Sequence, residues 1–253
     1  MIFWFSGTGN SLWLAQRLHE ATGETLIPMG EAMTRGDTVY ALAEHERIGF
    51  VFPIYGWNMP RVVRQFISRL QLSNYKNNYT YFACTCGDDM GTTEAQVARL
   101  LASKGWKLGG AYALKMPNTY VCLPGFDVDS LSVAGEKLRQ APATAEHICQ
   151  MVLEKRRGKH MTLPGRMPWT KTHILGTFFH RFLTDSRRFH AEDTCIGCGK
   201  CAAACPLHNI TMQDRPSWGA DCTMCLSCYH HCPHHAVAYG TATRNKGQYL
   251  HHD

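Results

Sequence analysis

The chain has 253 residues, of which 45% are hydrophobic and 18% are charged, a composition that is ordinary for a globular protein of one or two domains. No stretch reaches the roughly 18 apolar residues that a membrane-spanning helix needs, and the apolar run Ile2–Phe5 is preceded by no basic leader. We therefore expect a cytoplasmic protein without a spanning segment, whose 12 cysteines are thiols or metal ligands rather than disulfides.

Residues 1–157 alternate short apolar runs with amphipathic segments, which is the pattern of β/α units around a parallel sheet. The expected strands are Ile2–Phe5, Thr25–Pro28, Arg47–Phe52, Tyr79–Cys84 and Leu108–Lys115. The expected helices are Ser11–Ala21, Arg61–Leu70, Thr92–Lys104 and Leu131–Arg157. Together they predict a doubly wound α/β sheet in the strand order 2-1-3-4-5, whose loops after the first, third and fourth strands carry the chemistry.

The first of these loops is rich in hydroxyl groups and glycine and opens a helix. It reads Ser6-Gly7-Thr8-Gly9-Asn10-Ser11. Such a loop can surround a phosphate dianion without lysine or arginine, and it is also compatible with an ordinary turn into a capped helix. It is neither a Walker loop nor a dinucleotide-binding Gly-x-Gly-x-x-Gly motif. With Phe5 it resembles the FMN phosphate loop of the flavodoxins. That resemblance implies an FMN site that includes Ser6, Thr8, Gly9, Asn10 and Ser11.

The second loop, from Pro53 to Pro60, combines two aromatic residues with a glycine. The flavodoxins place one wall of the isoalloxazine site here, so the resemblance implies that Tyr55 or Trp57 stacks on the flavin and that Gly56 lets a peptide flip beside it. Packing of both aromatic side chains over the sheet edge is the alternative. The predicted flavin-binding residues of this loop are Pro53, Ile54, Tyr55, Gly56 and Trp57.

The third loop, residues 84–91, resembles the other wall of the flavin site, but it lacks the aromatic residue usual in that family. Its predicted flavin-binding residues are Thr85, Cys86, Gly87 and Asp88. We expect Cys84 to be a buried strand-end residue and Cys86 a loop thiol, with a redox pair or a metal site as the alternative. Asp88 and Asp89 are expected to be solvated rather than to tune a flavin.

Residues 158–190 are predicted to connect two domains, and they carry six Lys or Arg against one Asp or Glu. Gly158–Pro168 is predicted to be a loop and Thr170–Leu183 a short helix with one apolar side. We expect this helix to pack one domain on the other while its charges face water. A membrane surface or an acidic electron donor is the alternative partner.

Eight of the 12 cysteines lie within residues 191–253, in two runs of the same Cys-x2-Cys-x2-Cys-x3-Cys-Pro spacing. This spacing is typical of two [4Fe–4S] clusters in which each run gives three thiolates to its own cluster and the fourth to the other. One cluster would then take Cys195, Cys198, Cys201 and Cys232. The other would take Cys222, Cys225, Cys228 and Cys205. A pair of four-cysteine zinc sites is the alternative, but zinc sites need no third cysteine at this spacing.

The segment closely resembles the two-cluster bacterial ferredoxins, although Met224 and Leu226 lie in the second run, where that family usually has a glycine-rich filling. The formal charge of +6 would fall to about +2 with eight thiolates and two oxidised cluster cores, so it does not indicate a nucleic-acid partner. We expect the histidines at 230, 231, 234 and 235 to be exposed, and we infer no role for His251 and His252.

Taken together, the chain resembles flavodoxin–ferredoxin fusion proteins. The implied architecture is a flavodoxin-like FMN-binding domain at 1–157, a basic connector at 158–190 and a small α+β domain with two [4Fe–4S] clusters at 191–253. The resemblance implies an electron carrier that works between other redox proteins. An FMN-dependent reductase of a small substrate is the main alternative and a redox sensor a more distant one; no residue stands out as a catalytic acid or base.

Overall fold

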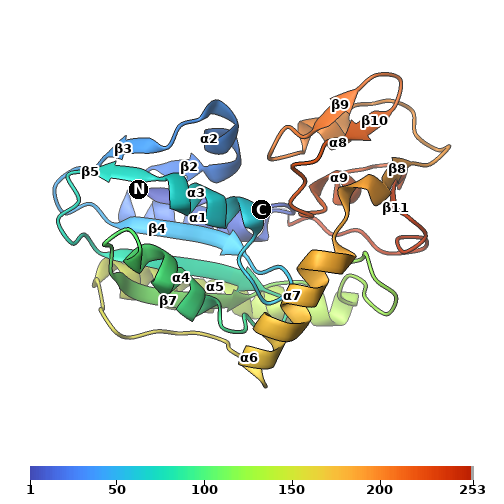
Figure 1. The fold of residues 1–253 in the computed structure, drawn as a ribbon. Helices are drawn as coiled ribbons and strands as arrows, with labels where there is room; N and C mark the ends of the chain where they lie inside the picture. Colours follow the sequence, from blue (N-terminus) through green and yellow to red (C-terminus); the bar gives the residue numbers. More distant parts are fainter. Residues whose placement is uncertain (252–253) are drawn as a thin grey trace.

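The computed structural model describes residues 1–251, so that His252 lies outside the described residues. Five parallel strands form the central sheet in the order β2-β1-β4-β6-β7, which confirms the predicted doubly wound α/β fold (Figure 1). These strands are β1 (Ile2–Trp4), β2 (Leu26–Pro28), β4 (Ile48–Pro53), β6 (Thr80–Cys86) and β7 (Leu108–Lys115).

Helices cover both faces of this sheet because alternate residues of its strands point to opposite sides. In β4, Phe50 and Phe52 enter one core while Val51 enters the other. The first core lies under α3 (Arg61–Arg69) and α4 (Thr93–Ala102), and the second lies under α1 (Asn10–Thr22) and α5 (Leu131–Leu153). A further helix, α2 (Met29–Arg35), and a two-stranded sheet of β3 (Val39–Ala41) and β5 (Gln71–Ser73) are elements that the sequence did not predict.

The connector first runs along the edge of the sheet, where Met161 exchanges backbone hydrogen bonds with β7. A helix then spans residues 168–183, built from α6 (Pro168–Thr170), a π-helical turn at Lys171–Leu175, α7 (Gly176–Phe178) and a second π-helical turn at Phe179–Leu183. A 3-10 turn at Ser186–Arg188 follows. The helix lies across the carboxyl-end side of the sheet, between the two domains (Figure 1).

The C-terminal domain is small and pairs its first and last strands. Strand β8 (Phe189–Ala191) is antiparallel to β11 (Val237–Tyr239), and β9 (Ile210–Met212) is antiparallel to β10 (Pro216–Trp218). Two short helices, α8 (Lys200–Ala203) and α9 (Ser227–His230), each contain the third cysteine of a run. Val121 and Cys122, from the loop after β7, complete the core of this domain. None of the helices in the described part of the chain has both the length and the apolar character needed to cross a bilayer.

Candidate functional site

A cavity of about 970 Å³ lies where the carboxyl ends of the strands meet the connector helix and the C-terminal domain. All but one of the residues predicted to bind FMN line it, and the exception is Gly9. Cys222 and Cys225 of the second cysteine run line the same cavity. The tertiary structure therefore joins the three predicted loops to one of the two cysteine runs at a single site.

The Ser6–Ser11 loop enters α1 with Gly9 as the N-cap residue, and no side chain caps the helix. The first backbone N–H groups of α1 therefore face the loop, as an anion site at a helix N-terminus requires. Two of the hydroxyl groups support the loop: the Ser6 Oγ accepts from the Gly9 N–H at 3.2 Å, and the Ser11 Oγ lies 2.7 Å from the Thr85 Oγ1. The site thus offers hydroxyls and backbone N–H groups to a phosphate.

Gly7 of this loop lies directly against the second cysteine run. A Cβ atom added to Gly7 would be 2.5 Å from the carbonyl oxygen of Cys225. Any larger residue would push the Ser6–Ser11 loop and the cysteine loop apart. Glycine at this position permits a close backbone approach between the two domains.

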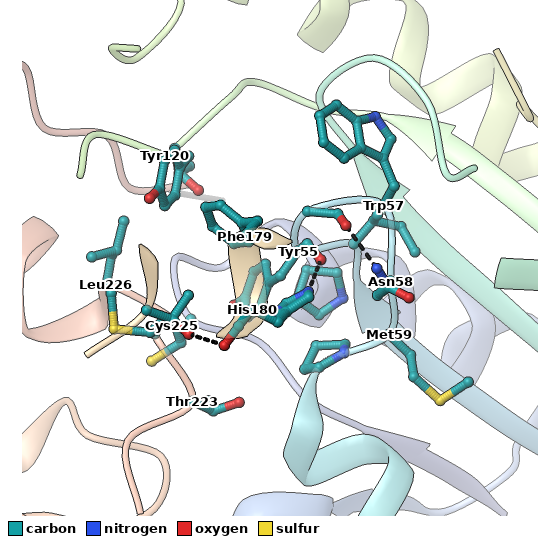
Figure 2. Close-up of a pocket in the computed structure, with 18 of the residues that line it drawn as sticks. Tyr55, Trp57, Asn58, Met59, Tyr120, Phe179, His180, Thr223, Cys225 and Leu226 are labelled. Atoms are coloured by element: carbon teal, nitrogen blue, oxygen red, sulfur yellow. Dashed lines mark hydrogen bonds between the residues drawn. The ribbon is translucent and has the colours of Figure 1, made fainter. Parts of the chain in front are cut away.

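Of the two candidate stacking residues, Tyr55 lies on the cysteine side of the cavity and Trp57 lies away from it. Tyr55 and Cys225 pack against the same core and are neighbours in Figure 2. Burial, and then the Cys225 and Cys222 thiols, hold the pKa of Tyr55 well above its ordinary value, so the phenol stays neutral. Trp57 points outward in Figure 2, and the Lys171 ammonium lies 5.8 Å from its ring.

The connector helix contributes Phe179 and His180 to this wall, and no sequence motif marks either residue for it. The Phe179 ring packs edge-on to Tyr120 at 5.2 Å, and its Cδ1 lies 2.6 Å from where a Cβ of Gly56 would be. The His180 Nε2 hydrogen-bonds to the Tyr55 carbonyl oxygen at 3.0 Å (Figure 2). Burial lowers the pKa of His180, which favours the neutral imidazole that donates this bond. No local pattern distinguishes Phe179 from its apolar neighbours.

The apolar side of this helix is only partly buried, which differs from the expected packing between the domains. Phe179 is the one phenylalanine of the helix that is not exposed, whereas Phe178 and Phe182 are 55% and 62% exposed. The polar side differs too, because Lys171 forms an ion pair with Asp89 rather than facing water.

The loop at residues 85–89 departs from the prediction at two positions, Cys86 and Asp89. Cys86 is the last residue of β6 and is buried, so it is not a loop thiol; burial, then the Asp89 carboxylate, raises its pKa to about 12. Asp88 is exposed as expected. Asp89 is 11% exposed and paired with Lys171, because the connector helix covers it, so the prediction of a solvated carboxylate is wrong here.

Two polar atoms of the cavity wall are compatible with a bound ligand. The hydroxyls of Tyr120 and Thr223 are buried and have no hydrogen-bond partner among the described residues. Both residues line the cavity. A buried hydroxyl without a partner costs about 1–3 kcal/mol, which a ligand with polar edges, such as a flavin ring, would relieve.

The eight cysteines of the two runs gather in two places. A small second cavity is lined by Cys195, Cys198, Cys201 and Cys232, which is the first predicted ligand set. Cys205 lies near the second set. Burial is the main cause that raises the pKa of Cys222, Cys225 and Cys228, and the nearby Cys205 thiol raises each of them further. Among residues 1–251, no group of three or more His, Cys, Asp or Glu side chains has the arrangement of ligands around a single metal ion.

Hydrogen-bond donors point at the sulfur atoms of these residues. Backbone N–H groups donate to Cys205 and Cys222 at 3.4 Å and to Cys232 at 3.2 Å. The Trp218 indole N–H donates to the Cys228 Sγ at 3.4 Å. Such donors stabilise the negative charge on cluster thiolates and set the potential of a cluster, so the donor set fits [4Fe–4S] ligation.

The two runs share one backbone path even where their residues differ. Gly197 and Gly199 have φ of 67° and 73°, and the matching Met224 and Leu226 have φ of 57° and 60°. A residue with a side chain pays roughly 1–2 kcal/mol for this conformation. Met224 and Leu226 are buried in the core of the C-terminal domain and also line the cavity, and burial of their side chains opposes that strain.

His230 is buried, contrary to the expectation of an exposed histidine. Its Nε2 donates to the Thr119 carbonyl oxygen at 2.8 Å, and its Nδ1 accepts from the Tyr249 N–H at 3.2 Å. The ring is 3% exposed, and burial lowers its pKa to about 4. His230 thereby joins the C-terminal domain to the loop after β7, although His230 and Thr119 are more than a hundred positions apart in the chain. His234 and His235 are exposed as predicted.

The geometry of the C-terminal domain agrees with its similarity to a known family. Residues 188–233 match the 4Fe-4S dicluster domain. The match supports 4Fe–4S chemistry in the C-terminal part of this chain, and its range includes both cysteine runs, from Cys195 to Pro233. No curated protein matches the chain.

Several solved structures are similar to the N-terminal part at low identity. A putative flavoprotein from Bacteroides uniformis ATCC 8492 is 19% identical over 46% of this chain and 88% of that chain, with a TM-score of 0.36. The Trp repressor binding protein from Bacillus subtilis is 14% identical over 57% and 97%, with a TM-score of 0.33. Rubredoxin oxygen:oxidoreductase from Desulfovibrio gigas is 15% identical over 60% and 36%, with a TM-score of 0.32. Because these scores are low, the fold is assigned from the strand order itself.

Proposed function

We propose that the protein is an electron-transfer protein that relays electrons between two [4Fe–4S] clusters and an FMN bound in the same chain. In this proposal residues 1–157 hold FMN, residues 158–190 connect the domains and residues 191–253 hold both clusters. When bound, FMN exchanges one or two electrons and each cluster exchanges one. The observation that carries the proposal is the shared cavity, which the phosphate loop, the Tyr55 loop and Cys225 all line.

The residues of the chain itself have three tasks in this proposal. The Ser6–Ser11 loop binds the phosphate through hydroxyls and the N-terminal N–H groups of α1. Tyr55 and Leu226 exclude water between the flavin loops and the second cysteine run, since both side chains lie in the wall of the cavity. The N–H groups that point at sulfur stabilise negative charge at the cluster ligands.

Anaerobic reconstitution followed by cofactor analysis tests this proposal. The wild-type chain should contain about eight iron atoms and one FMN, because each cysteine run predicts one four-iron cluster. Cys225→Ser should lower the iron content by about four atoms per chain. Cys149→Ser is the matched control, since Cys149 is a buried thiol of α5 outside both runs. Zinc in place of iron, or the absence of flavin, would overturn the relay.

A reductase of a small substrate, supplied with electrons by the dicluster domain, is the second candidate. The size of the cavity supports it, because about 970 Å³ is at the upper end of small-molecule sites and extends beyond the predicted flavin loops to Phe179. Saturable oxidation of the reduced protein by small organic acceptors would favour the reductase. Oxidation by protein acceptors alone would favour the carrier.

A further inference from the structure

Residues 248–251, here called the return segment, leave the dicluster domain and come back to the phosphate loop. The Tyr249 hydroxyl donates to the Asn10 Oδ1 at 3.0 Å, and the His251 N–H donates to the Thr8 carbonyl oxygen at 2.8 Å. Figure 1 shows the C-terminal end of the chain beside the N-terminal domain rather than within the dicluster domain. The return segment therefore hydrogen-bonds to two of the predicted phosphate-loop residues.

The packing between the return segment and the loop leaves no space at Gly9. A Cβ added to Gly9 would lie 2.9 Å from the His251 carbonyl oxygen, and the φ of 96° at Gly9 favours glycine in any case. The His251 ring also packs edge-on against Trp13 of α1 at 5.5 Å. The return segment thus packs against the backbone of the loop at Gly9, the N-cap residue of α1.

The other end of the return segment is fixed to the dicluster domain. The Gln248 side-chain amide donates to the carbonyl oxygens of Tyr229, at 2.5 Å, and of Cys232, at 2.8 Å. The Tyr249 N–H donates to the buried His230. The return segment consequently links the α9 region, which contains the third cysteine of the second run, to the phosphate loop.

Asn10 shows what this link does to the predicted phosphate site. Its Nδ2 donates to the Pro117 carbonyl oxygen at 3.0 Å while its Oδ1 accepts from Tyr249, and the side chain is buried. Both ends of the carboxamide are therefore engaged within the protein. Asn10 acts as a spacer that fixes the loop between β7 and the return segment, which leaves phosphate binding to the backbone N–H groups and hydroxyls.

We propose that the return segment preorganises the phosphate loop, with Tyr249 as a positioning residue, so that the phosphate of FMN binds tightly only when this segment is docked. The proposal rests on the proposed function, because it concerns the same FMN site. A loop already held in its bound conformation avoids the cost of ordering on binding. The effect should therefore appear for a flavin that carries the phosphate and not for riboflavin, which lacks it.

The test measures the affinity of the iron-loaded, flavin-free full chain for FMN and for riboflavin. Tyr249→Phe removes the hydroxyl that donates to the Asn10 Oδ1 and lies 3.2 Å from the His251 Nδ1. The variant should weaken FMN binding at least fivefold, or roughly 1 kcal/mol, the usual net worth of one hydrogen bond, and change riboflavin binding less than twofold. Tyr40→Phe is the matched control, because it removes one hydroxyl hydrogen bond, to the Asp37 carbonyl oxygen, on a different part of the domain.

A second pair of variants tests the backbone contact. His251→Pro removes the N–H that reaches Thr8, whereas His251→Ala keeps it. The proline variant should weaken FMN binding at least fivefold and the alanine variant less. Faster amide hydrogen exchange at residues 8–11 in flavin-free Tyr249→Phe is a readout that does not need flavin.

The outcomes separate this inference from the proposed function. If the wild-type chain binds no FMN, the relay is overturned, and unchanged hydrogen exchange in Tyr249→Phe would overturn the preorganisation as well. If the wild-type chain binds FMN but Tyr249→Phe binds it equally well, only the role of the return segment is wrong. An equal loss of FMN and riboflavin binding would also overturn it, because it would show general unfolding rather than an effect on the phosphate loop.

Discussion

Trp218 provides a test of the proposal that the Cys228 sulfur atom is a cluster ligand. It ends β10, its indole N–H donates to the Cys228 Sγ at 3.4 Å, and its ring stacks on Phe189 at 5.7 Å. Trp218→Phe removes the N–H donor and keeps an aromatic ring against Phe189. The change therefore acts mainly on the charge at one sulfur atom.

The size of the effect follows from the difference between two redox states. A hydrogen bond to a charged group contributes about 1.5–3 kcal/mol, and only part of that differs between the oxidised and reduced cluster, on the order of 1 kcal/mol. A tenfold change in a one-electron equilibrium, about 1.4 kcal/mol, corresponds to about 59 mV. Because the donor favours the reduced, more negative cluster, its removal should lower the potential of that cluster by roughly 40 mV.

An anaerobic redox titration followed by electron paramagnetic resonance measures this shift. The control is Trp169→Phe, at an exposed position of the connector helix. In the proposed two-cluster protein, we expect one of the two potentials to fall in Trp218→Phe and neither to change in the control. Equal shifts of both clusters, or no shift with full iron content, would show that the Trp218–Cys228 contact does not tune a cluster.

Two further substitutions test contacts at the site and a third is a control. The free energy of urea unfolding is measured for each. Gly7→Ala should cost about 1–3 kcal/mol, because its Cβ would meet the Cys225 backbone. Gly135→Ala, on the open face of α5, should instead stabilise by about 0.5–1 kcal/mol, so equal effects would contradict the contact at Gly7. Lys171→Ala should cost about 3 kcal/mol, because it leaves the mostly buried Asp89 carboxylate unpaired, and a loss below 0.5 kcal/mol would mean that water reaches Asp89.

The strands of the central sheet were predictable because their signal is local. Each is a short apolar run between turn residues, and the crossover helices then restrict the strand order to few possibilities. The missed elements lack that signal: β3 is three residues long, and Val39 within it is 67% exposed. Its pairing with β5 depends on a segment some thirty residues later, which no local pattern reports.

The errors at the site have the same origin. Asp89 was expected to face water, but the connector helix places Lys171 beside it, so that the two form a partly buried ion pair. His230 was expected to be exposed, and the contacts with Thr119 and Tyr249 bury it. In each case the residue type is polar, so its sequence neighbourhood predicts exposure, and a distant partner reverses the outcome.

Local sequence was enough to predict the chemistry of each part of the chain. The spacing of the cysteines predicts cluster ligands because thiolates at these intervals can surround an iron–sulfur core, and the hydroxyl-rich loop before α1 predicts an anion site because a helix N-terminus follows it. The tertiary structure decided how the two parts meet. Packing between residues far apart in the chain places Cys225 against Gly7 and brings Tyr249 back to Asn10. Local sequence does not predict such contacts, because they depend on how the chain between the two partners folds.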